Sequence, residues 1–131
     1  MLKGSCCCSL VQFELSEIPS MMGTCHCNRC RKVGASHLIF VKSDSLKITQ
    51  GKDKISTFKA IPPYKYDRSF CSVCGTSLGE ILSDEDSFPL AANCIDGDLG
   101  IENKFHEFVS EKPDWFKIGD SAKQFDEHPF E

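Results

Sequence analysis

Eight of the nine cysteines in this 131-residue chain lie in three short clusters. The clusters are Cys6-Cys7-Cys8, then Cys25-His26-Cys27 with Cys30, and finally Cys71-Ser72-Val73-Cys74-Gly75. Grouped thiolates can reach a single divalent ion, because Zn–S bonds are only ~2.3 Å long and a tetrahedral site needs several sulfurs close together. The clusters therefore predict a metal-binding protein whose ligand spacings are those of zinc sites.

The first and third clusters predict one closed site. Side chains two residues apart on a strand share a face, so Cys6 and Cys8 can converge on one ion while Cys7 points away. The motif Cys71-x-x-Cys74-Gly75 is typical of a zinc knuckle, whose tight turn needs a glycine and directs two sulfurs to one point. Together the two motifs supply four sulfurs, which is the form expected of a structural zinc.

The middle cluster is one ligand short. Cys25, Cys27 and Cys30 give three sulfurs, and no fourth ligand lies at a natural spacing. Three protein ligands and one open position is the arrangement of a catalytic zinc. We expect His26 to face away from the ion, as a supporting or surface residue. Two alternatives stay open: Cys94 closes the site from a distant strand, or the cluster is a second structural site completed by Cys94 or His26.

The rest of the chain predicts a mainly β fold with little helix. Short segments in which apolar residues alternate with polar ones or form a continuous run, bounded by turn residues, are typical of strands. They cover residues 11–15, 38–41, 45–49, 55–58, 76–82 and 88–95. Only Asn28–Val33 is predicted as a helical turn. Beyond Asp96-Gly97-Asp98 the pattern is less regular, and we expect the apolar side chains there to pack onto the sheets, namely Phe105, Phe108, Trp115, Phe116 and Ile118. One zinc-binding domain is predicted over residues 1–131.

Charge and hydropathy exclude several functions. The net charge is −4, whereas nucleic-acid binders carry basic patches, and the densest basic group is only Arg29, Arg31 and Lys32. No segment approaches the ~18 consecutive apolar residues of a membrane span. The N-terminus lacks the apolar region of a secretory signal. We therefore expect a cytoplasmic protein with reduced thiols and with no nucleic-acid or membrane partner.

Several longer motifs carry a resemblance to a known family. They are Gly4-Ser5-Cys6-x-Cys8 with Val11-x-Phe13-Glu14, Cys25-His26-Cys27-x-x-Cys30-Arg31-Lys32, Arg68-x-Phe70-Cys71-x-x-Cys74-Gly75-Thr76, and Trp115 with Phe125-Asp126-Glu127-x-Pro129. In this order the motifs resemble the glutathione-dependent formaldehyde-activating enzyme family, which includes the domain of centromere protein V. A glycine commonly follows the first C-x-C motif in that family, and this chain has Ser9 there.

The resemblance implies a β-tent-like fold of small antiparallel sheets with two zinc ions. Cys6, Cys8, Cys71 and Cys74 would hold the structural ion, and Cys25, Cys27 and Cys30 the catalytic one. It also implies a carbon–sulfur lyase that forms or cleaves S-hydroxymethylglutathione, with glutathione as the small-molecule thiol partner. The basic group Arg29, Arg31 and Lys32 offers candidates to hold a glutathione carboxylate. The main alternative is a non-catalytic zinc-stabilised binding module, with a thiol redox sensor using Cys7 and Cys94 as a lesser one.

Overall fold

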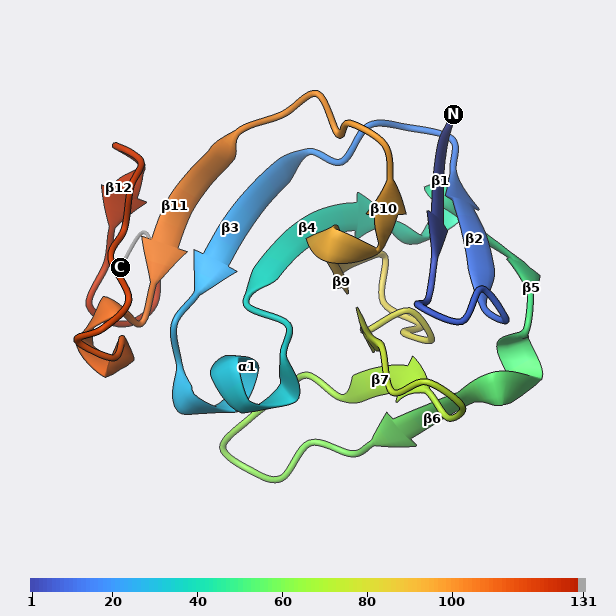
Figure 1. The fold of residues 1–131 in the computed structure, drawn as a ribbon, viewed down its shortest axis with the longest axis horizontal. Helices are drawn as coiled ribbons and strands as arrows, with labels where there is room; N and C mark the ends of the chain where they lie inside the picture. The colour runs from blue at the N-terminus through green and yellow to red at the C-terminus, as the bar shows by residue number, and fades with distance from the viewer. Residues whose placement is uncertain (130–131) are drawn as a thin grey trace.

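Three small β-sheets and one short helix make up the fold over residues 1–129, which the computed structural model describes (Figure 1). The mainly β class predicted from the sequence is confirmed. The helix α1 (Asn28–Val33) lies where the helical turn was predicted. Single turns of 3₁₀ helix cover Ser43–Ser45, Lys52–Lys54, Ala92–Cys94 and Val109–Glu111.

The first sheet carries the N-terminal cysteines at its end. Its strands lie in the order β10-β1-β2-β5 and are all antiparallel to their neighbours. They are β1 (Leu2–Ser5), β2 (Gln12–Leu15), β5 (Leu46–Gln50) and β10 (Ile95–Asp96). Val11, Phe13 and Leu15 are buried, as their alternation predicts. Gly4 pairs with Phe13 across the two strands, and the Phe13 ring occupies the space that a Cβ at Gly4 would need.

The second sheet places the middle cysteine cluster. Its strands, in the order β12-β11-β3-β4-β9, are β3 (Met21–Cys25), β4 (His37–Lys42), β9 (Ser87–Ala91), β11 (Asn103–Glu107) and β12 (Lys123–Gln124). Strand β11 runs parallel to both β3 and β12, whereas β4 is antiparallel to β3 and β9. The parallel pairing is notable because it brings the end of β11 beside the end of β3, where Cys25 lies (Figure 1).

The third sheet carries the last cysteine cluster. It has the order β6-β7-β8, with β6 (Ile55–Phe58), β7 (Arg68–Cys71) and β8 (Ser77–Gly79). Pro62 and Pro63 supply no backbone donor for a sheet, and no strand forms in segment 59–67. The three sheets share one apolar core that includes Phe13, Ile39, Leu78 and Leu90.

Several predicted boundaries were wrong. The run 88–95 is split by a 3₁₀ turn at Ala92–Cys94 into β9 and β10, which belong to different sheets. Strand β8 is shorter than the predicted 76–82. Trp115 does not pack onto a sheet, because it follows Pro113 in an irregular segment and is 78% exposed. In the described residues, the helices are too short to cross a membrane.

Candidate metal centres

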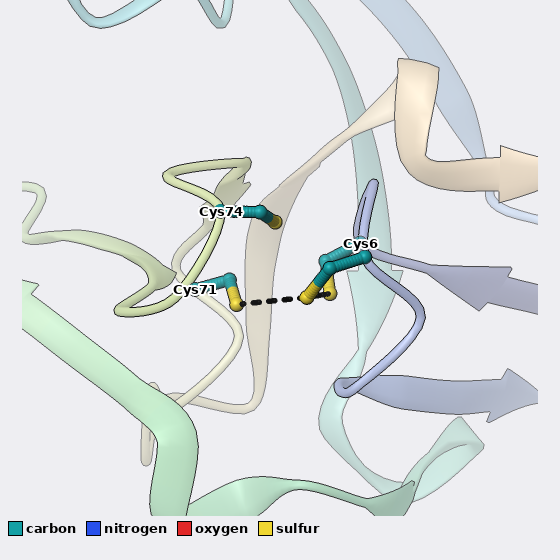
Figure 2. Close-up of side chains that lie close together, drawn as sticks. Cys6, Cys71 and Cys74 are labelled. Carbon is teal, nitrogen blue, oxygen red and sulfur yellow. Dashed lines mark hydrogen bonds between the residues drawn. The ribbon is translucent and has the colours of Figure 1, made fainter.

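Cys6, Cys8, Cys71 and Cys74 meet in what we term the four-cysteine cluster. Their four sulfurs all lie within 4.8 Å of one another. The Sγ atoms of Cys6 and Cys8 are 3.6 Å apart, and those of Cys8 and Cys71 are 3.8 Å apart. Tetrahedral ligands on Zn–S bonds of ~2.3 Å would be separated by about 3.8 Å, so the arrangement fits zinc. Figure 2 shows the sulfurs of Cys6, Cys71 and Cys74 facing a common point from two different loops.

The two loops are built so that their sulfurs converge. Gly75 has φ 79°, which is the left-handed conformation expected for the knuckle, and its N–H donates to the carbonyl of Cys71. The Cys7 N–H donates to Oγ1 of Thr76 at 2.9 Å and thereby ties one loop to the other. Hydrogen bonds from the Thr76 side chain and backbone lower the pKa of Cys74 to about 5, which favours the thiolate form that a metal binds.

Cys7 and Cys94 lie outside the four-cysteine cluster and also outside the group that Cys25, Cys27 and Cys30 form. Cys7 is exposed and does not join the four sulfurs, as predicted, but Cys6–Cys8 follows β1 in a turn and not in the extended backbone from which this was argued. Cys94 is buried in the core with Cys6 and Cys71, and its thiol donates to the carbonyl of Ser77 at 3.2 Å. Burial raises the pKa of Cys94 to about 11. The alternative in which Cys94 closes the middle site is therefore wrong, because Cys94 packs in a different apolar cluster from Cys25, Cys27 and Cys30 and does not join their sulfurs.

Cys25, Cys27 and Cys30 form a second group, which we term the three-cysteine cluster. Their sulfurs also lie within 4.8 Å of one another, and within residues 1–129 no fourth Cys, His, Asp or Glu ligand joins them. Cys25 is the last residue of β3, and Cys27 caps the N-terminus of α1 with an extended backbone. The Cys27 sulfur accepts a hydrogen bond from the Cys30 N–H at 3.3 Å, which places these two side chains one helical turn apart on the same side.

The three-cysteine cluster favours a thiolate at its centre. Hydrogen bonds from the Cys25 and Cys30 thiols lower the pKa of Cys27 to about 2, and the same contact raises the pKa of Cys25. All three residues are buried. A buried group of close sulfurs with one ionised member fits a thiophilic divalent ion such as zinc.

Two further residues lie beside this cluster. Nη2 of Arg68 donates to the Cys30 sulfur at 3.0 Å in a buried contact. Glu107 is paired with Cys25 across β11 and β3, so its carboxyl belongs to the surroundings of this cluster. Burial raises the pKa of Glu107. No spacing rule marks Glu107, whereas Arg68 stands three residues before Cys71 in the third motif and so was visible in the sequence.

His26 does not face the cluster, as predicted, but it is buried and not at the surface. Its Nε2 lies 2.8 Å from Nδ1 of His106, and Nε2 of His106 lies 2.8 Å from Oδ1 of Asp120. Burial lowers the pKa of His26, so the neutral ring is favoured. The alternative in which His26 is a metal ligand is therefore wrong. Instead this hydrogen-bonded chain fixes the segment between Cys25 and Cys27 to β11 and to the loop that follows it.

The basic group of α1 separates into three environments. The guanidinium of Arg29 donates to the carbonyl of Tyr66 and lies 4.7 Å from the centre of the Tyr64 ring. Arg31 donates to the side chain of Asn28 on its own helix. Lys32 is exposed. Arg29 is thus the member of the group that reaches toward the segment preceding Arg68.

Fold and clusters define a class of mainly β proteins with two cysteine sites that can each hold a metal ion. The family model described as glutathione-dependent formaldehyde-activating enzyme matches residues 1–111. The chain therefore belongs to that family. A crystal structure of a Rhodobacter sphaeroides protein, a structural genomics target, shares 20% sequence identity with a TM-score of 0.61, covering 73% of this chain and 89% of that chain. At this identity the likeness shows a shared fold. No curated protein matches the sequence significantly.

Proposed function

We propose that this protein is a zinc-dependent carbon–sulfur lyase acting on a glutathione–aldehyde adduct of the S-hydroxymethylglutathione type. The observation that carries the proposal is the three-cysteine cluster, in which three buried sulfurs gather without a fourth protein ligand in the described part of the chain. A catalytic zinc keeps such a position for substrate. Family membership supports the choice of substrate class.

Each cluster has a distinct role in this proposal. Cys6, Cys8, Cys71 and Cys74 hold a structural zinc, and Cys25, Cys27 and Cys30 hold the catalytic one. When bound there, zinc supplies a Lewis-acidic position at which a thiol is favoured as its thiolate. Of the basic residues on α1, Arg29 is our candidate to hold a carboxylate of glutathione, because its neighbour Cys30 belongs to the cluster and its guanidinium extends to the facing loop.

The test combines zinc content with glutathione-dependent conversion of formaldehyde. We expect two zinc ions per wild-type chain and one in Cys25→Ser and Cys30→Ser, with conversion lost and the circular dichroism spectrum kept. Cys7→Ser is the matched control, since this exposed cysteine lies outside both clusters, and it should keep both ions. Unchanged turnover in Cys30→Ser would defeat the proposal. Two bound zincs with no lyase activity would instead favour a non-catalytic binding module.

A further inference from the structure

We propose that Arg68 is the counter-ion of the three-cysteine metal centre, a positioning residue that holds the Cys30 sulfur and balances the charge of the cluster's thiolates. The inference rests on metal binding at this cluster, as in the proposed function, but it does not depend on which reaction the protein catalyses. It gives a specific role to the arginine of the third motif, which is not itself a metal ligand.

Burial is the first observation. Arg68 begins β7 and is only 8% exposed. Burying a guanidinium costs several kcal/mol unless an opposite charge compensates it. Arginine keeps its charge at every accessible pH, so it cannot avoid this cost by losing a proton. A compensating negative charge must therefore lie close to the Arg68 side chain.

The partners of Arg68 identify that charge. Within residues 1–129 no carboxylate oxygen lies within the 4.0 Å of an ion pair, and the buried Nε has no hydrogen-bond partner. Its side-chain hydrogen bond goes to the Cys30 sulfur at 3.0 Å. A neutral thiol is a weak hydrogen-bond acceptor and carries no charge. A metal-bound thiolate is a stronger acceptor and also carries negative charge.

Charge arithmetic agrees with this pairing. Three thiolates on a divalent ion leave a net charge of −1, and the guanidinium adds +1. The metal centre and Arg68 together are then close to neutral, which is the arrangement that a buried site requires. Without Arg68, the cluster would hold an uncompensated negative charge in the protein interior.

Glu80 is the other buried acidic group that could compensate the charge of Arg68 in place of the cluster's thiolates. Its side chain is also buried, with one carboxyl oxygen accepting from the Asp67 N–H at 2.9 Å and the other without a partner in the described structure. Burial raises the pKa of Glu80, which favours the uncharged acid. Because Glu80 also lies beyond ion-pair distance from Arg68, it is the weaker candidate.

The experiment measures cobalt(II) and zinc affinity separately at the two clusters by competition with a chelator. We expect Arg68→Gln to weaken binding at the three-cysteine cluster by about 10- to 100-fold, a range typical for partners of metal ligands. Arg68→Lys should weaken it less, since the charge is retained. The thiolate-to-cobalt charge-transfer band of this cluster should move to lower energy in Arg68→Gln, because the hydrogen bond to the Cys30 sulfur is lost. The four-cysteine cluster should bind as in the wild type.

Two controls match the changes in charge. Lys32→Gln removes one positive charge from α1 at an exposed site, and Glu80→Gln removes the buried carboxyl; both should keep wild-type affinity at both clusters. The proposal is overturned by wild-type affinity in Arg68→Gln, by equal weakening of both clusters in that variant, or by a matching loss in Glu80→Gln. If Arg68→Gln does not fold, an unshifted band with wild-type affinity in Arg68→Lys overturns it.

The same measurements keep this inference separate from the proposed function. A wild-type protein that binds two metal ions but converts no adduct would defeat the lyase proposal and leave the role of Arg68 standing. Wild-type metal affinity in Arg68→Gln, with glutathione-dependent turnover in the wild type, would do the reverse.

Discussion

Nε2 of His26 and Nδ1 of His106 lie 2.8 Å apart, although the two residues are separated by 80 positions in the chain. The contact joins the segment between two residues of the three-cysteine cluster, Cys25 and Cys27, to β11. Their rings are also stacked, with centroids 5.0 Å apart. Because His26 is buried, His106 is the group that satisfies a ring nitrogen which water cannot reach.

We expect His106→Ala to lower the free energy of unfolding by about 1–3 kcal/mol, since it leaves the His26 nitrogen buried without a partner. Urea unfolding of the zinc-loaded protein near neutral pH measures the effect. His37→Ala is the control: this exposed histidine contacts Thr24 at the edge of the same region, and its loss should cost less than about 0.5 kcal/mol. Equal effects of the two substitutions would contradict the role given to His106.

A pH dependence of stability is expected from Glu80. Burial raises the pKa of this carboxyl above its ordinary value of 4.5, so the folded protein binds the proton more tightly than the unfolded chain does. The wild type should therefore lose stability relative to Glu80→Gln as the pH rises above that value. The difference between the unfolding free energies of the two proteins, measured from about pH 5.5 to about pH 8, tests this, because residue 80 does not titrate in the Gln variant. A wild-type stability that rises relative to that of Glu80→Gln as the pH increases would contradict the prediction.

We predict that the backbone conformation of Ser9, in the β1–β2 loop, lowers the stability of the protein. It has φ 65°, a left-handed conformation that costs a residue with a side chain about 1–2 kcal/mol and that glycine adopts freely. Ser9→Gly should therefore stabilise the protein by up to about 1 kcal/mol, after the larger entropy of the unfolded glycine chain is subtracted. Chemical denaturation provides the measurement.

The control for Ser9 is the same substitution on extended backbone. Ser5 lies in β1, where glycine weakens a strand, so Ser5→Gly should destabilise by about 0.5–1 kcal/mol or more. Destabilisation by both substitutions would show that the backbone conformation of Ser9 carries no strain.

The two cysteine clusters should differ in their effect on folding. Cys71 is fully buried in the shared core, and its cluster joins the β1–β2 loop to the β7–β8 loop. We expect Cys71→Ser to cost more than about 4 kcal/mol, the range reached when a structural metal is lost. Thermal unfolding followed by circular dichroism should show a far larger drop for Cys71→Ser than for Cys25→Ser. Similar drops would mean that both clusters are structural.

The parts of this protein that local sequence encodes were predicted correctly. The convergence of Cys6 and Cys8 without Cys7 is confirmed, although the motif lies in a turn after β1 and not in a strand, and the knuckle motif anticipated the left-handed Gly75. The helix at Asn28–Val33 was also predicted with its bounds. These features depend on residues close together in the chain, for which spacing is sufficient information.

The surroundings of the three-cysteine cluster could not be predicted in the same way. The parallel pairing of β11 with β3 brings Glu107 beside Cys25 and His106 beside His26, and β11 was not recognised as a strand. Cys94 had the right chemistry, but the 3₁₀ turn in which it lies directs it into the core. Such contacts depend on the packing of distant segments, which neither periodicity nor motif spacing reports.

The clusters enclose very different lengths of chain, and this bears on the order in which metal is acquired during synthesis. The residues of the three-cysteine cluster lie within residues 25–30, whereas those of the four-cysteine cluster extend from residue 6 to residue 74. Closing a short loop costs less entropy, and N-terminal residues leave the ribosome first. The three-cysteine cluster is thus complete before Arg68 has been translated. A nascent chain supplied with a single ion would therefore bind it at the three-cysteine cluster, and the four-cysteine cluster, whose loops belong to two sheets, would still be empty.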